Sequence, residues 1–213
     1  MRQSGIVLIE LIVVAGTLVV LAAMGAAVVP RVQEVQRETQ SLDNVRNIAI
    51  LLTERSIRKG FPPIDGKNFV LSLVAYRVID VRNPANLGVF FSPGDPWYTL
   101  ESTNQARYRE LTIQALKAGY DFHELTSYAG RRNKDRDHVI TSLAMKRVVP
   151  VLCDDDDGPL HHRKGLVMGY TDGSARFVTW QQLEMARPED PDDPEPFLGD
   201  DASVEVLRAL SSE

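Results

Sequence analysis

The chain is almost entirely apolar from Leu11 to Val29, near its start, and contains no charged side chain there. About 20 apolar residues in a helix span the ~30 Å hydrocarbon core of a bilayer, because a helix pairs every backbone polar group within one segment. The pattern therefore predicts a transmembrane helix over residues 6–30. Glu10 lies at the start of this run, where a carboxylate is costly in lipid, so it is a candidate functional residue that needs a partner.

Between Arg31 and Gly60, apolar residues recur at spacings of mostly three and four, and charged residues fill the other faces. This period predicts an amphipathic helix over residues 31–60. If it continues the membrane segment, residues 6–59 form one helix of ~80 Å at 1.5 Å per residue, which Gly60-Phe61-Pro62-Pro63 ends. We expect its apolar stripe to pack on the chain's own globular domain rather than on another protein.

Residues 61–186 show shorter, mixed patterns that predict a globular α+β domain. The expected helices cover Asn68–Arg77, Ser102–Leu116 and Trp180–Met185. The expected strands cover Leu87–Phe91, Arg147–Cys153, Gly165–Tyr170 and Ala175–Trp180. Asp172-Gly173 between the last two strands is a strong hairpin signal, and Pro150 predicts an edge or a bulge in its own strand.

The end of the chain, residues 187–213, is an acidic tail rich in proline. Four prolines and seven carboxylates lie between Arg187 and Asp201. Such a segment buries too little apolar surface to order itself, so we expect an exposed, extended linker. Val204, Leu207 and Leu210 then predict a short terminal helix that docks on the domain.

Composition narrows the possible functions of the 213-residue chain, which has room for one ordinary soluble domain besides the membrane segment. The net charge of -5 gives no sign of nucleic-acid binding, which needs a basic surface. Cys153 is the only cysteine, so no intrachain disulfide can form. Neither a G-x-S-x-G motif nor a Walker loop occurs in the sequence, and we expect no enzymatic activity.

Three interpretations fit the N-terminal segment. A secretory signal peptide has a basic start and an apolar core, but this core is longer than usual and carries Glu10. A plain signal anchor explains the length and leaves Glu10 as an interfacial residue. In the third, Gly5-Ile6-Val7-Leu8-Ile9-Glu10-Leu11 resembles the N-terminus of type IV pilins and of type II secretion pseudopilins. In that family a short basic leader ends in Gly and is followed by apolar residues, a Glu and an apolar helix.

This resemblance implies a function and a location. Residues 1–5 would be a leader, and a prepilin peptidase would cut between Gly5 and Ile6 and methylate the new amino group of Ile6. Glu10 would face a neighbouring subunit during assembly into a type IV pilus or a secretion pseudopilus. The freed amino group is a cation that a neighbour's Glu10 can neutralise within a dry helix bundle.

The same resemblance implies a pilin-like α+β fold, in which the long helix packs against a small antiparallel sheet. The protein would cross the bacterial inner membrane once, in contact with its lipid. The globular domain would lie on the periplasmic side, and the subunit would be extractable into a filament with other pilin or pseudopilin subunits. No nucleic acid is expected as a partner.

A second resemblance lies in the C-terminal third. His162, nine intervening residues and Asp172-Gly173, with Phe177 soon after, resemble the prepilin-type processing-associated domain that is named for this H, nine residues, D, G pattern. That domain occurs downstream of pilin-like N-termini. We expect His162 to form a hydrogen bond that locks the base of the hairpin, and Asp172 and Gly173 to shape its turn.

Asp154, Asp155, Asp156 and Asp157, together with His161, His162 and Asp172, form the one cluster that suggests a ligand. Successive carboxylates repel one another, and calcium relieves this through oxygen ligands, as in a globular loop of some pseudopilins. A solvated acidic turn is the other interpretation, and zinc at His161 and His162 has less support because their spacing fits no zinc motif. The alternative function is therefore a single-pass, membrane-anchored metal- or ligand-binding domain that does not polymerise.

Overall fold

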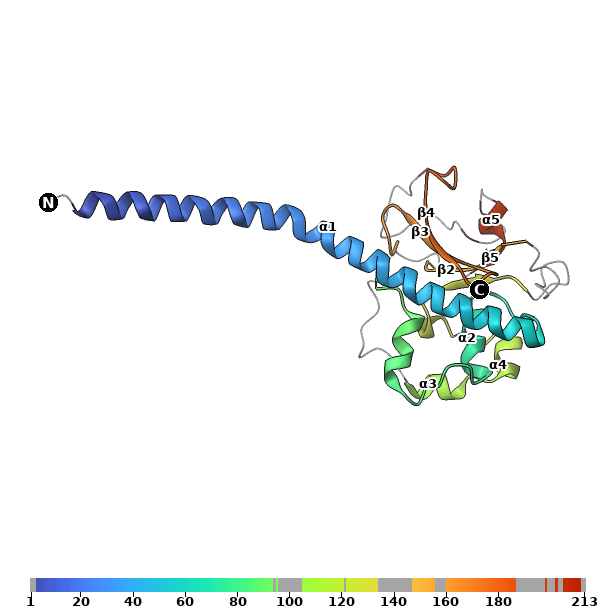
Figure 1. The fold of residues 1–213 in the computed structure, drawn as a ribbon. Helices are drawn as coiled ribbons and strands as arrows, with labels where there is room; N and C mark the ends of the chain where they lie inside the picture. Colours follow the sequence, from blue (N-terminus) through green and yellow to red (C-terminus); the bar gives the residue numbers. More distant parts are fainter. Residues whose placement is uncertain are drawn as a thin grey trace. The chain divides into compact units, whose positions relative to one another are not determined.

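The computed structural model describes residues 3–93, 95, 105–120, 122–133, 147–155, 160–186, 198, 202 and 205–211. The chain divides into two compact units, Met1–Gln36 and Arg37–Glu213. Helix α1, Gln3–Lys59, runs through both of them without a break and includes Pro30 (Figure 1). The long N-terminal helix is therefore confirmed.

The first unit consists of the N-terminal part of α1. Its large apolar side chains from Leu11 to Val35 are exposed in the isolated chain, as the 53% exposure of Val20 and the 69% exposure of Val19 show. Within the described residues, α1 is the helix long and apolar enough to cross a membrane. An apolar helix surface that is exposed over this length is typical of a segment that lipid or another helix covers.

The second unit contains the other half of α1, and here the predicted amphipathic stripe is buried only in its middle part, because Ile57 is exposed, as are Val32 and Val35 in the first unit. Val45, Ile48 and Leu52 are at most 1% exposed and belong to the main hydrophobic core. Gly60 ends the helix in the left-handed region, at φ +72°, and its N–H donates to the carbonyl of Ser56. A glycine after the last helical residue is the usual helix terminator, because it adopts this conformation without strain.

A five-stranded antiparallel sheet forms the centre of the second unit, in the order β4-β3-β2-β1-β5. The strands are β1, Ala129–Arg131; β2, Pro150–Cys153; β3, Gly165–Tyr170; β4, Ala175–Thr179; and β5, Leu210–Ser211. The chain therefore has an α+β fold, as predicted, and the β3–β4 hairpin is confirmed.

Strand β2 carries the irregularity that its proline predicts. Its register with β3 shifts between Pro150 and Leu152, so β2 has a bulge, although it lies inside the sheet and not at an edge. Val151 and Leu152 consequently both face the main core, whereas Cys153 packs on the opposite face.

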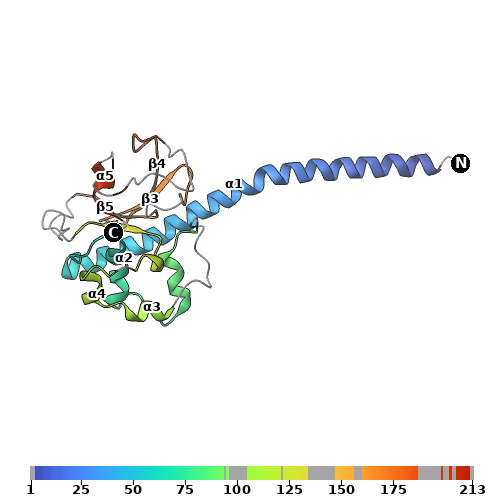
Figure 2. The same cartoon turned by 180° about the vertical axis from the view of Figure 1, so that it is seen from behind.

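The sheet separates two hydrophobic clusters, and different helices cover its two faces (Figures 1 and 2). The C-terminal half of α1 and α2, Gly66–Ala75, lie on one face, where the short helices η1, α3, α4 and η3 extend the layer. These helices are η1, Pro84–Phe90; α3, Gln105–Glu110; α4, Ile113–Lys117; and η3, His123–Leu125. The other face carries α5, Glu205–Arg208, and the buried side chain of Trp180.

Two predicted elements of the helical layer were wrong or incomplete. The strand expected at Leu87–Phe91 is the 3₁₀ helix η1, which begins after Asn83, whose side chain accepts the N–H of Ala85. The helix expected over Ser102–Leu116 is divided into α3 and α4, and residues 102–104 lie outside the described residues. Thr112 causes the division, because its hydroxyl caps the start of α4.

The C-terminal region also differs from its prediction. The helix expected at Trp180–Met185 is only a turn, which ends because Glu184 adopts a left-handed conformation, at φ +57°. The expected terminal helix is confirmed as α5, but Leu210 belongs to β5 instead of the helix. Of the tail that was expected to be exposed, Leu198 is described, and its side chain is buried in the second cluster.

Candidate functional site

The residues of the N-terminal motif lie in the first turns of α1. Gly5 and Ile6 follow closely after the first residue of this helix, Gln3. Ile6 and Glu10 are four residues apart and therefore share one face of the helix. The side chain of Glu10 is exposed, so its carboxylate is accessible to a partner that approaches α1 from the side.

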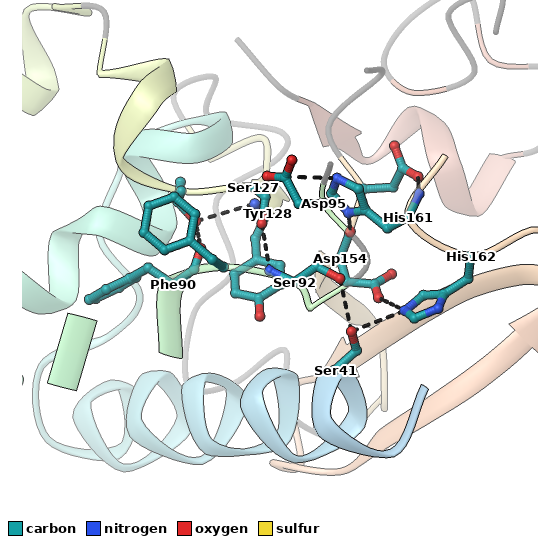
Figure 3. A network of polar contacts seen from close by, with 12 residues as sticks. Ser41, Phe90, Ser92, Asp95, Ser127, Tyr128, Asp154, His161 and His162 are labelled. Atoms are coloured by element: carbon teal, nitrogen blue, oxygen red, sulfur yellow. Dashed lines mark hydrogen bonds and ion pairs between the residues drawn. The ribbon is translucent and has the colours of Figure 1, made fainter. Parts of the chain in front are cut away.

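His162 lies in the loop before β3, and its imidazole is buried (Figure 3). Its Nε2 atom is 3.0 Å from Oγ of Ser41 on α1 and 2.8 Å from Oδ2 of Asp154, which follows β2. The ring also meets the ring of Phe177 on β4 edge to face, with 5.9 Å between centroids. The hydrogen bond of His162 thus reaches Ser41 on α1, and the close approach of its Nε2 to Asp154 reaches the end of β2.

Asp154 and Ser41 extend this contact into a buried polar network. Asp154 is fully buried, and its Oδ1 accepts the N–H of Val167 on β3 at 2.7 Å. Ser41 Oγ lies 2.8 Å from Ser92 Oγ, and the N–H of Ser92 donates to Ser127 Oγ at 2.6 Å (Figure 3). Buried polar groups are stable only when paired, so these bonds hold together four segments that are distant in sequence.

Ser41, His162 and Asp154 are the residue types of a hydrolase triad, but their geometry is different. In a triad the carboxylate binds one imidazole nitrogen and the hydroxyl the other. Here both groups approach Nε2. This nitrogen carries at most one proton, so it cannot accept a proton from Ser41 while donating one to Asp154. The three side chains are also buried, so this arrangement fastens α1 to the sheet.

The hairpin turn is shaped by Asp172. Its carboxylate accepts hydrogen bonds from the N–H of Ser174 at 2.9 Å and from the hydroxyl of the same residue at 2.6 Å. These bonds stabilise the charged form and lower the pKa of Asp172 below its ordinary value. The turn between β3 and β4 is thereby held by a side chain of the H, nine residues, D, G pattern.

The same turn contacts α1. Gly173 has a φ of +78°, and a Cβ atom there would lie 3.2 Å from Cγ1 of Ile50. The hydroxyl of Thr53 donates to the carbonyl of Thr171 at 3.0 Å. Glycine is therefore the residue that fits position 173 with least strain, because its backbone is left-handed and α1 lies directly beside it.

Both ends of the H, nine residues, D, G pattern thus dock on one helix. His162 reaches α1 at Ser41, and the turn reaches it at Ile50 and Thr53. Ser41 and Thr53 are 12 positions apart, or ~18 Å along the helix axis. We call these two contacts the helix clamp. Sequence reasoning did not identify Ser41, although its spacing of four and seven residues from Val45 and Ile48 places this serine on the buried stripe.

The acidic cluster is not a solvated turn where it is described. Asp154 and Asp155 are both fully buried. Asp154 belongs to the buried polar network described above, and Asp155 accepts the backbone N–H of His161 at 3.3 Å. Asp156 and Asp157 lie outside the described residues. The imidazole of His161 bonds through Nδ1 to the carbonyl of Asp154 and lies 4.0 Å from Oδ2 of Asp95.

Metal binding has no preformed site in the described part of the chain. There, no three His, Cys, Asp or Glu side chains are grouped so that they could hold an ion. His161 and His162 contact different carboxylates, so they do not share a ligand position. Calcium at Asp154 to Asp157 stays a prediction.

Comparisons with models of protein families, with curated proteins and with solved structures found no match to this chain. The fold and the site together define an α+β protein with one long N-terminal helix that could cross a membrane. A buried clamp fastens the C-terminal half of that helix to the sheet.

Proposed function

We propose that this protein is a pilin-like structural subunit. Prepilin peptidase cleaves it between Gly5 and Ile6 and methylates the new amino group. Residues 6–30 hold it in the bacterial inner membrane, with the globular domain on the periplasmic side, until α1 packs into a type IV pilus or a type II secretion pseudopilus. The observation that supports this most is the Gly5-to-Glu10 pattern at the start of an apolar helix whose side chains are exposed.

The exposed apolar surface of α1 gives a reason for lateral assembly. Burial of apolar surface contributes roughly 25 cal/mol per Å² removed from water, so a helix bundle stabilises this segment once α1 has left the lipid. In such a bundle an unpaired carboxylate is costly. The amino group of Ile6 on a neighbouring subunit neutralises Glu10, and this pairing fixes how far the two helices are offset.

The helix clamp supports the same proposal at the other end of α1. A filament subunit is pulled along its helix while the globular domain follows. Hydrogen bonds at Ser41 and Thr53 hold two levels of the helix to the sheet, so the C-terminal half of α1 resists sliding past its own domain. The contacts of the H, nine residues, D, G pattern thus serve the transfer of force within one subunit.

Replacing Glu10 tests the assembly step. Glu10→Ala is expected to lower the amount of sheared filament or of cross-linked subunit ladders at least about tenfold, because breaking a buried ion pair costs about 3–5 kcal/mol. Glu54→Ala is the matched control, because Glu54 is an exposed carboxylate on the same helix outside the apolar run. Assembly of Glu10→Ala at the level of the unmodified chain would contradict the proposal.

A further inference from the structure

Strand β4 lies at one edge of the sheet, and no other described strand covers its outer side. The strand order places β4 and β5 at the two edges, and β5 has only two residues. β4 has five residues, Ala175–Thr179. An edge strand of this length presents N–H and C=O groups along its outer side, where an extended segment of another chain can add as a further strand.

The hydrogen bonds of the β3–β4 hairpin determine which backbone groups of β4 point outward. The N–H of Tyr170 on β3 donates to the carbonyl of Ser174 at 2.9 Å. Bonds between two antiparallel strands involve every second residue, so the even-numbered residues of β4 bond to β3. The backbone N–H and C=O groups of Ala175, Phe177 and Thr179 therefore point away from β3.

A local turn already occupies the outward groups of Thr179. Its N–H donates to Oε1 of Gln182 at 2.9 Å, and its carbonyl accepts the N–H of Leu183 at 3.1 Å. Among the described residues, none bonds to the outward groups of Ala175 and Phe177. These two N–H groups and two C=O groups are therefore available to a further strand.

Arg176 lies between these two residues and determines which strand fits beside them. Its side chain is exposed, and its guanidinium lies 5.5 Å from the centre of the Tyr170 ring. An antiparallel second copy that used all the available groups would pair Ala175 with Phe177 of the copy. It would then place Arg176 directly opposite Arg176 of the copy, and like charges at opposite positions destabilise a strand pair. A strand with a carboxylate at that position is favoured instead.

We propose that an extended segment of another protein adds to this edge as a further strand. We call the outward backbone groups of Ala175 and Phe177, together with the side chain of Arg176, the β4 edge. The segment carries Asp or Glu opposite Arg176. The residues on either side of this carboxylate are apolar, because side chains alternate between the two faces of a sheet and theirs lie beside the half-buried Phe177. This binding involves neither cleavage nor the apolar part of α1, so it is independent of the proposed function.

Binding of a fluorescent peptide to the full chain in detergent, measured by anisotropy, tests the proposal. The probe is Thr-Val-Glu-Val-Thr with capped ends, and the matched control peptide has Lys in place of Glu. We expect the Glu probe to bind at least about threefold more tightly, although the net charge of -5 would attract the Lys probe if charge alone decided. Arg176→Glu should reverse this preference. Arg109→Glu, which changes an exposed arginine on α3, should leave it unchanged.

Methylated probes separate strand addition from attraction between side chains. In the added strand the N–H groups of both valines face β4, and the N–H of the glutamate points away from it. Methylation of both valine nitrogens should weaken binding at least about tenfold, because two hydrogen bonds are lost. Methylation of the glutamate nitrogen should have little effect.

Four results would overturn the proposal. They are the absence of saturable binding, equal binding of the Glu and Lys probes, an unchanged preference in Arg176→Glu, and equal affinities of the two methylated probes. Chemical cross-linking tests a second copy as the occupant. Dimers of the unmodified chain whose yield falls when the Glu probe is added would show that a copy occupies the β4 edge, and would also contradict the proposal.

Discussion

Replacing Asp154 by alanine tests whether the buried network fastens α1 to the sheet. The substitution removes the acceptor of the Val167 N–H and the carboxylate beside His162 Nε2. A buried N–H without a partner costs about 1–3 kcal/mol. We therefore expect Asp154→Ala to lower the free energy of unfolding by about 1–3 kcal/mol.

Asp172→Ala is the matched control for this prediction. Asp172 also accepts two hydrogen bonds, both from Ser174, but its side chain is exposed. Water replaces these bonds, so we expect a loss of only about 0.5–1.5 kcal/mol. Burial is thus the main difference between the two substitutions.

The assay is urea unfolding of the full chain in detergent, followed by tryptophan fluorescence. Trp180 reports on the domain because it is buried in the second hydrophobic cluster. The reasoning predicts that Asp154→Ala shifts the unfolding midpoint at least about twice as far as Asp172→Ala. Equal shifts would refute it, since they would show that the buried network contributes no more than an exposed turn.

Two further predictions concern the hairpin turn. Gly173→Ala should destabilise the protein by more than the roughly 1 kcal/mol that a left-handed alanine costs, because the added Cβ meets Ile50. Gly119→Ala is the control, because Gly119 has a similar φ of +75° but open space around it. Thermal unfolding of Gly173→Ala and Gly119→Ala measures the difference, and equal losses would show that the contact with Ile50 is not strained. Ser174→Ala should raise the pKa of Asp172 towards its ordinary value, because the hydroxyl no longer donates to the carboxylate. Since the folded pKa lies below the unfolded value of about 3.9, the stabilisation by Asp172 is complete above that pH and is lost as the pH falls through the folded pKa. Unfolding curves between pH 6 and acid should therefore be less pH-dependent in Ser174→Ala, and an unchanged pH dependence would contradict this cause of the shift.

The elements that the sequence predicted well have strong local signals. The period of apolar residues predicted α1 through Lys59, and Asp172-Gly173 predicted the turn between β3 and β4. Both signals arise from neighbours in the sequence. Helix period and turn chemistry therefore suffice for them without knowledge of tertiary contacts.

The elements that the sequence missed depend on distant partners. Strand β1 has only three residues, with Gly130 at its centre, and becomes a strand because β2 and β5 pair with it. Asp154 is the first of four successive carboxylates, a pattern that suggested an exposed turn. Its contacts with the Val167 N–H and with His162 allow it to be buried instead. No local pattern encodes such pairings, so burial of this residue could not be predicted.

The central claim is that the chain is processed as a pilin-like subunit, and the mass of its mature N-terminus tests this most directly. The measurement is mass spectrometry of the protein from membranes that contain active prepilin peptidase. The account predicts an N-terminal peptide that begins with Ile6 and carries one methyl group on its amino nitrogen. Protein that still begins at Met1, or that is cut within Gly25 to Ala27 as a secretory signal would be, would contradict it.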